Sequence, residues 1–186
     1  DETLKKREKE WQLLMAVAEL AKDIDVIGWH PFYQPDIEGD LYKSYPDDIR
    51  VFKKWANEQG FQGEFFASEW NVSTFYPSPT PPNWWGNLNY TELDKAKYIA
   101  RISVLHTALD VSSFFCETWN NSYSMDLGLL RRSYYSNPVS VMHPQAGYYA
   151  MRNLATALDE LTSADFKFTI KGQASKIESY MMQREG

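Results

Sequence analysis

Three short clusters in this sequence combine carboxylate, imidazole, amide and aromatic groups. They are residues 29–33 (Trp-His-Pro-Phe-Tyr), 68–71 (Ser-Glu-Trp-Asn) and 117–121 (Glu-Thr-Trp-Asn-Asn). Carboxylates and imidazoles act as nucleophiles, acids and bases. Flat aromatic faces bind the apolar faces of sugar rings, with polar groups at the rim. Together the clusters predict a site for nucleophilic or acid–base chemistry on a polar, ring-shaped substrate.

The elements that would position these clusters alternate between helix and strand. Helices are expected up to about Lys22, over residues 46–59 with Gly60 after the end, over 91–108 with Thr91 as N-cap, and over 144–160 with Pro144 at the start. Strands are expected over residues 24–31, 63–71 and 111–119. Such alternation implies parallel strands with helical crossovers, so the fold class is α/β.

The remaining segments are expected to be loops or a terminal hairpin. Residues 72–89 and 120–141 are expected to form irregular loops. Residues 166–170 and 177–182 alternate apolar and polar side chains around Lys171-Gly172, which is typical of an antiparallel hairpin. A boundary is therefore expected near Ser163.

Three parallel strands are too few to close a barrel, which needs eight. A glycine-rich phosphate loop follows none of the expected strands, so a partial (β/α) barrel is favoured over a doubly wound sheet. In such a barrel the active-site groups project from the carboxyl ends of the strands. Side-chain alternation then predicts three sets that each share a face: Phe65, Ala67, Glu69 and Asn71; Val26, Gly28 and His30; and Phe115, Glu117 and Trp119.

These segments resemble the last strands of clan-A retaining glycoside hydrolases, the β-xylosidase, β-glucosidase and cellulase superfamily. The resemblance covers most of residues 24–160, including a closing helix at 145–154. It implies the C-terminal part of a (β/α)8 TIM barrel, about strands 6 to 8 with their helices, over residues 1–162. Residues 163–186 would begin an antiparallel β appendage, a C-terminal β-domain that the chain end truncates.

The resemblance also implies an activity, the retaining hydrolysis of β-linked glycosides with no metal and no organic cofactor. Glu69 corresponds to the nucleophile at the end of the seventh strand. The expected substrate-binding residues are His30, Tyr33, Asn71, Trp85, Glu117, Trp119 and Asn120, with Trp119 as the sugar platform. The clan's acid/base is a Glu preceded by Asn at the end of the fourth strand. No Asn-Glu pair ends an expected strand here, so the acid/base is expected upstream of Asp1.

The charge pattern excludes some partners, while other functions stay open. The net charge is −6 and the basic residues are scattered, which argues against nucleic acid or an anionic membrane surface. No apolar run reaches membrane-spanning length. Cys116 is the single cysteine and leaves the compartment open. The expected partners are a carbohydrate and the N-terminal part of the barrel, from the same or a complementary chain. The alternatives are a non-catalytic carbohydrate-binding module or degenerate barrel, and a structural half-barrel that assembles with a partner chain.

Overall fold

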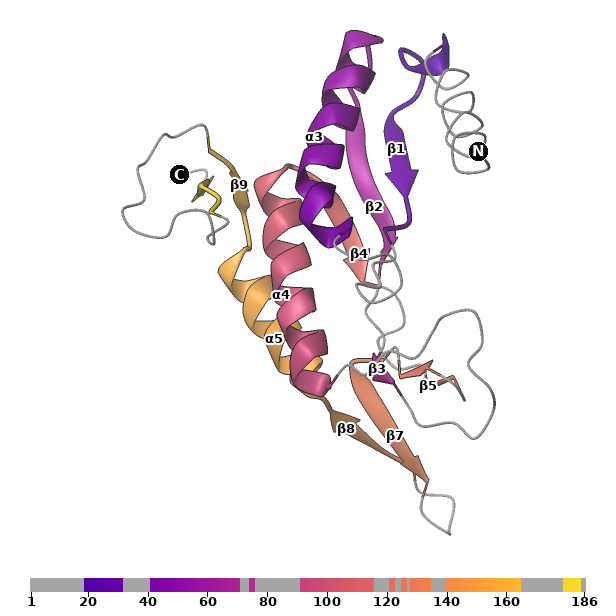
Figure 1. Cartoon of the computed structure of the whole chain (residues 1–186), viewed down its shortest axis with the longest axis vertical. Helices are drawn as coiled ribbons and strands as arrows, with labels where there is room; N and C mark the ends of the chain where they lie inside the picture. Colours follow the sequence, from indigo (N-terminus) through magenta and orange to yellow (C-terminus); the bar gives the residue numbers. More distant parts are fainter. Residues whose placement is uncertain are drawn as a thin grey trace.

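The computed structural model describes residues 19–31, 41–70, 74–75, 91–115, 121–122, 125–126, 128–134, 140–164 and 179–184. Its larger elements are β1 (Val26–Trp29), α3 (Leu41–Glu58), β2 (Glu64–Trp70), α4 (Glu92–Ala108), β4 (Ser112–Phe115) and α5 (Ala146–Ala157) (Figure 1). Strands and helices therefore alternate from β1 to β4, as the sequence predicts.

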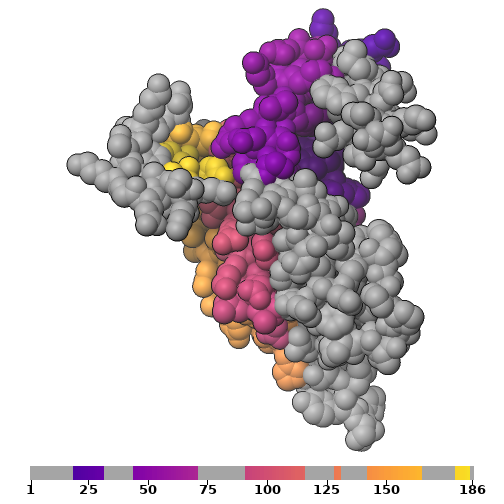
Figure 2. Space-filling view, viewed as in Figure 1, coloured from indigo at the N-terminus to yellow at the C-terminus, as the bar shows by residue number. Residues whose placement is uncertain are grey.

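One parallel sheet carries the first part of the chain. Its strand order is β1-β2-β4, with Ile27 opposite Phe65 and Ala67 opposite Ser113. Helix α3 connects β1 to β2, and α4 connects β2 to β4. The two helices lie over the same face of the sheet, where their side chains cover it (Figures 1 and 2).

The core lies between this sheet and the helices. Buried residues of both layers contribute to it, among them Ala56, Phe61, Phe65, Ala67, Trp70, Ile99, Ile102 and Leu105. The ring of Phe65 contacts Phe61 at 4.9 Å and Phe52 of α3 at 6.0 Å between centroids, both edge to face. Gly63 allows the chain to enter β2, because a Cβ there would lie 2.0 Å from the carbonyl oxygen of Asp25. Burial of these apolar side chains fixes β2 as the centre of the sheet.

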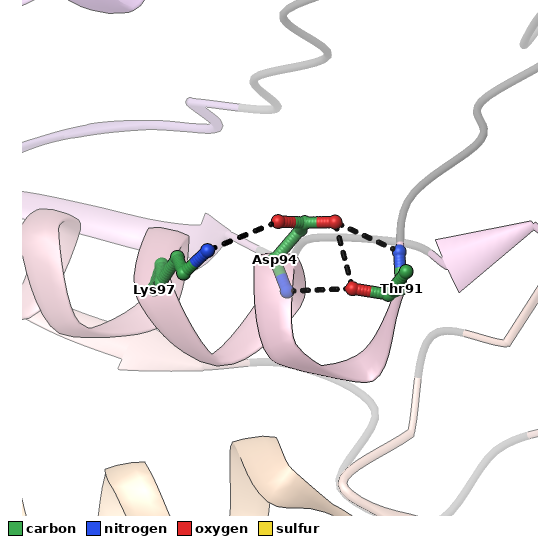
Figure 3. A network of polar contacts seen from close by, with 3 residues as sticks. All are labelled: Thr91, Asp94 and Lys97. Atoms are coloured by element: carbon green, nitrogen blue, oxygen red, sulfur yellow. Dashed lines mark hydrogen bonds and ion pairs between the residues drawn. The ribbon is translucent and has the colours of Figure 1, made fainter.

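Helix α4 begins as the sequence predicts. The Thr91 hydroxyl accepts a hydrogen bond from the Asp94 amide, and the Asp94 carboxylate accepts one from the Thr91 amide (Figure 3). This reciprocal capping box satisfies two free helix amides. The hydrogen bonds from Thr91 lower the pKa of the Asp94 carboxyl, and Lys97 lies 3.4 Å from its other oxygen.

Two helix starts differ from the sequence prediction. Helix α3 begins at Leu41 rather than Pro46, and the buried Pro46 lies inside it. A proline at this position lacks the amide of one helical hydrogen bond. The expected helix start at Pro144 is also wrong, because Pro144 is the last residue of a strand and pairs with Leu130. Helix α5 begins after Gln145, while Gly60 follows α3 with a φ of 95°, as expected.

The segment at 120–141 is not the irregular loop that the sequence predicts. It contains β5 (Asn121–Ser122), β6 (Met125–Asp126) and β7 (Leu130–Tyr134), and β7 pairs antiparallel with β8 (Ser140–Pro144). Strand β6 lies between β5 and β3 (Thr74–Phe75) in a small antiparallel sheet. Strand β3 belongs to the other expected loop, residues 72–89, which follows β2. Backbone hydrogen bonds therefore join this loop to the segment that follows β4.

The last described residues form a two-stranded antiparallel sheet. Strand β9 (Leu161–Ser163) pairs with β10 (Met182–Arg184). The Ser163 amide donates to the Asp110 carboxylate at 2.9 Å, which ties β9 to the turn after α4. The core of the hairpin expected at 166–182 lies outside the described residues. Across the described ranges, no helix combines the length and the apolar character needed to cross a membrane.

Candidate active site at the strand ends

Two residues from the predicted clusters meet where neighbouring parallel strands end. His30 directly follows β1, and Glu69 is the penultimate residue of β2. The His30 Nδ1 lies 3.3 Å from the Glu69 Oε2, and the two side chains are 55% and 38% exposed. The carboxyl ends of β1 and β2 therefore bring an imidazole and a carboxylate together at a surface that a ligand can reach.

A register shift in β2 sets the direction of Glu69. Ala67 pairs with Ser113 and Trp70 pairs with Phe115, so three steps along β2 match two steps along β4. An extra residue of this kind is a β-bulge, which changes the side-chain alternation. Trp70 is thereby buried on the helix side with 1% exposure, while Glu69 is left facing His30.

The predicted alternation is therefore wrong at Glu69. The sequence places Phe65, Ala67 and Glu69 on one face, but Phe65 and Ala67 are buried in the core with 5% and 0% exposure. The alternation of β1 is as expected, because Ile27 and Trp29 pack on the core whereas Val26, Gly28 and His30 are exposed. The bulge between Ala67 and Trp70 is the physical reason for the difference.

The backbone below the pair is closely packed. The Ser68 hydroxyl donates to the carbonyl oxygen of Trp29 at 3.3 Å, which links β1 to β2 beside the pair. A Cβ on Gly28 would lie 3.3 Å from this hydroxyl, tighter than most such contacts. A glycine at position 28 therefore leaves room for Ser68 between the two strand ends.

A buried polar group lies beneath the pair, on the helix side of the sheet. The Trp29 Nε1 donates to the Tyr45 hydroxyl at 3.2 Å, and that hydroxyl lies 2.9 Å from the His106 Nε2. His106 is 1% exposed, and its ring meets the rings of Tyr45 and Trp70 edge to face. Burial lowers the pKa of His106 to about 4, so its imidazole is neutral at neutral pH.

Tyr45 and His106 are not among the site residues that the sequence predicts. A signal for His106 exists, since it follows Ile99 and Ile102 at helical spacing and so falls on the buried face of α4. Its partner Tyr45 is 61 positions away in the chain, and no local pattern connects the two.

The His30–Glu69 pair provides a carboxylate that a neighbouring imidazole can hold in position. An imidazole N–H at Nδ1 can donate to Oε2, which leaves the other carboxylate oxygen available. Within the described ranges, no group of three or more His, Cys, Asp or Glu side chains is arranged to hold a metal ion. The remaining predicted site residues, Tyr33, Asn71, Trp85, Glu117, Trp119 and Asn120, lie outside the described residues.

No family model, curated protein or solved structure matches this chain.

Proposed function

We propose that this protein is a glycoside hydrolase that cleaves β-linked glycosides with retention of configuration, and that Glu69 is its nucleophile. The observation that carries the proposal is the contact of 3.3 Å between His30 and Glu69 at the carboxyl ends of adjacent parallel strands. That edge is where (β/α) folds hold their active sites. In a (β/α)8 barrel, β1, β2 and β4 would be about the sixth, seventh and eighth strands.

The chemistry follows from the two oxygens of the Glu69 carboxylate. His30 holds Oε2, and Oε1 attacks the anomeric carbon. The bond from that carbon to the leaving oxygen breaks, and the leaving oxygen takes a proton from a second carboxyl group. Water then attacks the glycosyl ester, and the second carboxylate accepts its proton, which releases Glu69.

The second carboxyl group must lie about 5–5.5 Å from Glu69 in a retaining enzyme. The resemblance to clan-A hydrolases assigns it to a strand that precedes Asp1 in the barrel. We therefore propose that the N-terminal part of the barrel, from the same or a complementary chain, completes the site. No metal or organic cofactor takes part in this scheme.

Assembly with a partner chain is a second candidate function, because the parallel sheet has two outer strands. Within the part of the chain that is described, β1 and β4 each pair on one side only. Val26 on β1 is 46% exposed and Phe114 on β4 is 59% exposed. Apolar side chains at open sheet edges favour pairing with further strands.

A non-catalytic carbohydrate-binding module would use the same polar and aromatic groups without turnover.

The stereochemistry of the first product distinguishes these functions. The intact protein is mixed in an NMR tube with 2,4-dinitrophenyl β-glucoside, β-xyloside and β-galactoside, whose leaving group needs no protonation. We expect the β-anomer of the free sugar to appear first and to equilibrate later with the α-anomer. Early α-anomer would contradict a nucleophilic Glu69, and sugar binding without release of dinitrophenol would favour the binding module.

A further inference from the structure

We propose that Tyr45 and His106 act as a buried clamp that positions His30 against Glu69. They are positioning residues, since the atoms that would meet a substrate belong to the two strand ends. The effect of this Tyr45–His106 clamp on a reaction rate rests on the proposed function, whereas its effect on the geometry of the pair does not.

The contacts support the clamp because they form a closed loop that includes both His30 and Glu69. Starting from the pair, His30 is bonded to Trp29, whose indole N–H donates to the Tyr45 hydroxyl at 3.2 Å. The Tyr45 hydroxyl lies 2.9 Å from the His106 Nε2. The centroids of the His106 and Trp70 rings are 5.8 Å apart, with an angle of 84° between the ring planes. Trp70 is bonded to Glu69, which contacts His30 at 3.3 Å.

The two tryptophans are the means by which the clamp reaches the strand ends. Trp29 and Trp70 each directly neighbour one member of the pair, and both point to the helix side of the sheet. The ring of Trp29 packs against Phe52 of α3, with 6.1 Å between the ring centroids, and Trp70 packs against Phe115 of β4, with 4.9 Å between the centroids. A shift of either indole moves the backbone of the adjacent site residue. Helices α3 and α4 thus determine the separation of His30 and Glu69 from below.

Stability alone does not account for a histidine at position 106. Its ring is buried, and its Nδ1 has no hydrogen-bond partner among the described residues. A buried polar atom without a partner is unfavourable, so an apolar side chain of similar volume would suit a purely structural position better. What His106 adds over an apolar residue is the contact with the Tyr45 hydroxyl, which in turn binds Trp29.

The imidazole NMR spectrum of the intact protein tests the clamp directly. The chain has 3 histidines, His30, His106 and His143, so their ring nitrogens can be assigned separately. At pH 9 the wild-type His30 signals should report a ring with its proton on Nδ1, because Nδ1 faces Glu69. Tyr45→Phe keeps the ring but removes the hydroxyl. We expect it to shift the His30 signals toward those of a freely hydrated imidazole and to leave the exposed His143 unchanged.

Two further positions in this loop of contacts, Trp29 and His106, can be tested in the same way. Trp29→Phe removes the indole N–H and should shift His30 as Tyr45→Phe does, which keeps the test decisive if one of the two variants fails to fold. His106→Leu should also shift His30, whereas His106→Gln keeps a polar group near Nε2 and should restore more than half of the difference. Unchanged His30 signals in folded Tyr45→Phe or Trp29→Phe would overturn the clamp.

A rate measurement then separates the clamp from the proposed function. If the protein hydrolyses aryl glycosides, folded Tyr45→Phe should lose up to about 100-fold in kcat with little change in KM, since small misplacements of reacting groups have effects of that size. An unchanged kcat would overturn the clamp even if hydrolysis is confirmed. If no glycoside is hydrolysed, the proposed function fails and the His30 signals still decide the clamp.

Discussion

Replacement of Glu69 with alanine is expected to lower kcat for aryl β-glycosides by roughly 10³-fold or more, because it removes the carboxylate that we propose as the nucleophile. The side chain is 38% exposed and makes no contribution to the buried core, so the fold should be kept. Added azide should restore turnover by attack from the vacated side and give the α-glycosyl azide. Steady-state kinetics and NMR of the product measure the two effects.

Glu64→Gln is the matched control for this experiment. Glu64 lies on the same strand, is exposed, and stands at the opposite end of β2 from Glu69. It should keep nearly all of the activity and show no response to azide. If Glu69→Ala kept even a tenth of the wild-type kcat, Glu69 would not be the nucleophile.

The second large effect concerns stability at acid pH. Burial lowers the pKa of His106 from 6.5 to about 4. The unfolded chain then binds a proton at His106 more readily than the native protein does. The contribution of this group to the free energy of unfolding is therefore highest above pH 6.5 and decreases as the pH falls toward 4. The difference in pKa corresponds to about 3 kcal/mol in the free energy of unfolding.

Urea unfolding of the wild type and of His106→Gln at pH 7 and pH 4 measures this loss. Other groups titrate in the same range, so the relevant quantity is the difference between the two proteins. We expect the variant to lose about 3 kcal/mol less than the wild type on acidification. His143→Gln, at an exposed position, should behave as the wild type. Equal losses in wild type and His106→Gln would show that His106 is not a buried neutral group.

Elements with local signals were predictable from the sequence. The start of α4 is specified within four residues by the Thr91–Asp94 capping box, and the end of α3 by Gly60. The apolar runs of β1, β2 and β4 indicate strands without knowledge of their neighbours. The alternation of these strands with helices was enough to predict a parallel sheet with helical crossovers.

Features that depend on pairing between distant segments were not predictable. The strands β3, β5 and β6 have two residues each, so they lack a periodic pattern. Strands β7 and β8 show no sustained alternation of apolar and polar residues, and β8 ends with Pro144. Such short strands form because a partner supplies hydrogen bonds, which a single-segment pattern does not reveal.

The meeting of His30 and Glu69 was predictable from the sequence, but the direction of the Glu69 side chain was not. Both residues lie at the carboxyl ends of neighbouring parallel strands. The bulge that turns Glu69 toward His30 arises from the pairing of β2 with β4, so strict alternation assigned the wrong companions to Glu69. The Tyr45–His106 clamp joins two helices through one hydroxyl, a contact that only the packed structure brings about.

Trapping of the glycosyl intermediate tests the central claim most directly. The intact protein is incubated with 2,4-dinitrophenyl 2-deoxy-2-fluoro-β-glycosides of glucose, xylose and galactose, then digested with trypsin. Glu69 falls in the peptide of residues 55–95, which also contains Glu58, Glu64 and Glu92 as internal controls. We expect one fluorosugar per chain, located at Glu69 by fragmentation of that peptide and absent from Glu69→Gln. A sugar on any other carboxylate, or a protein that hydrolyses the parent glycosides yet forms no adduct, would contradict it.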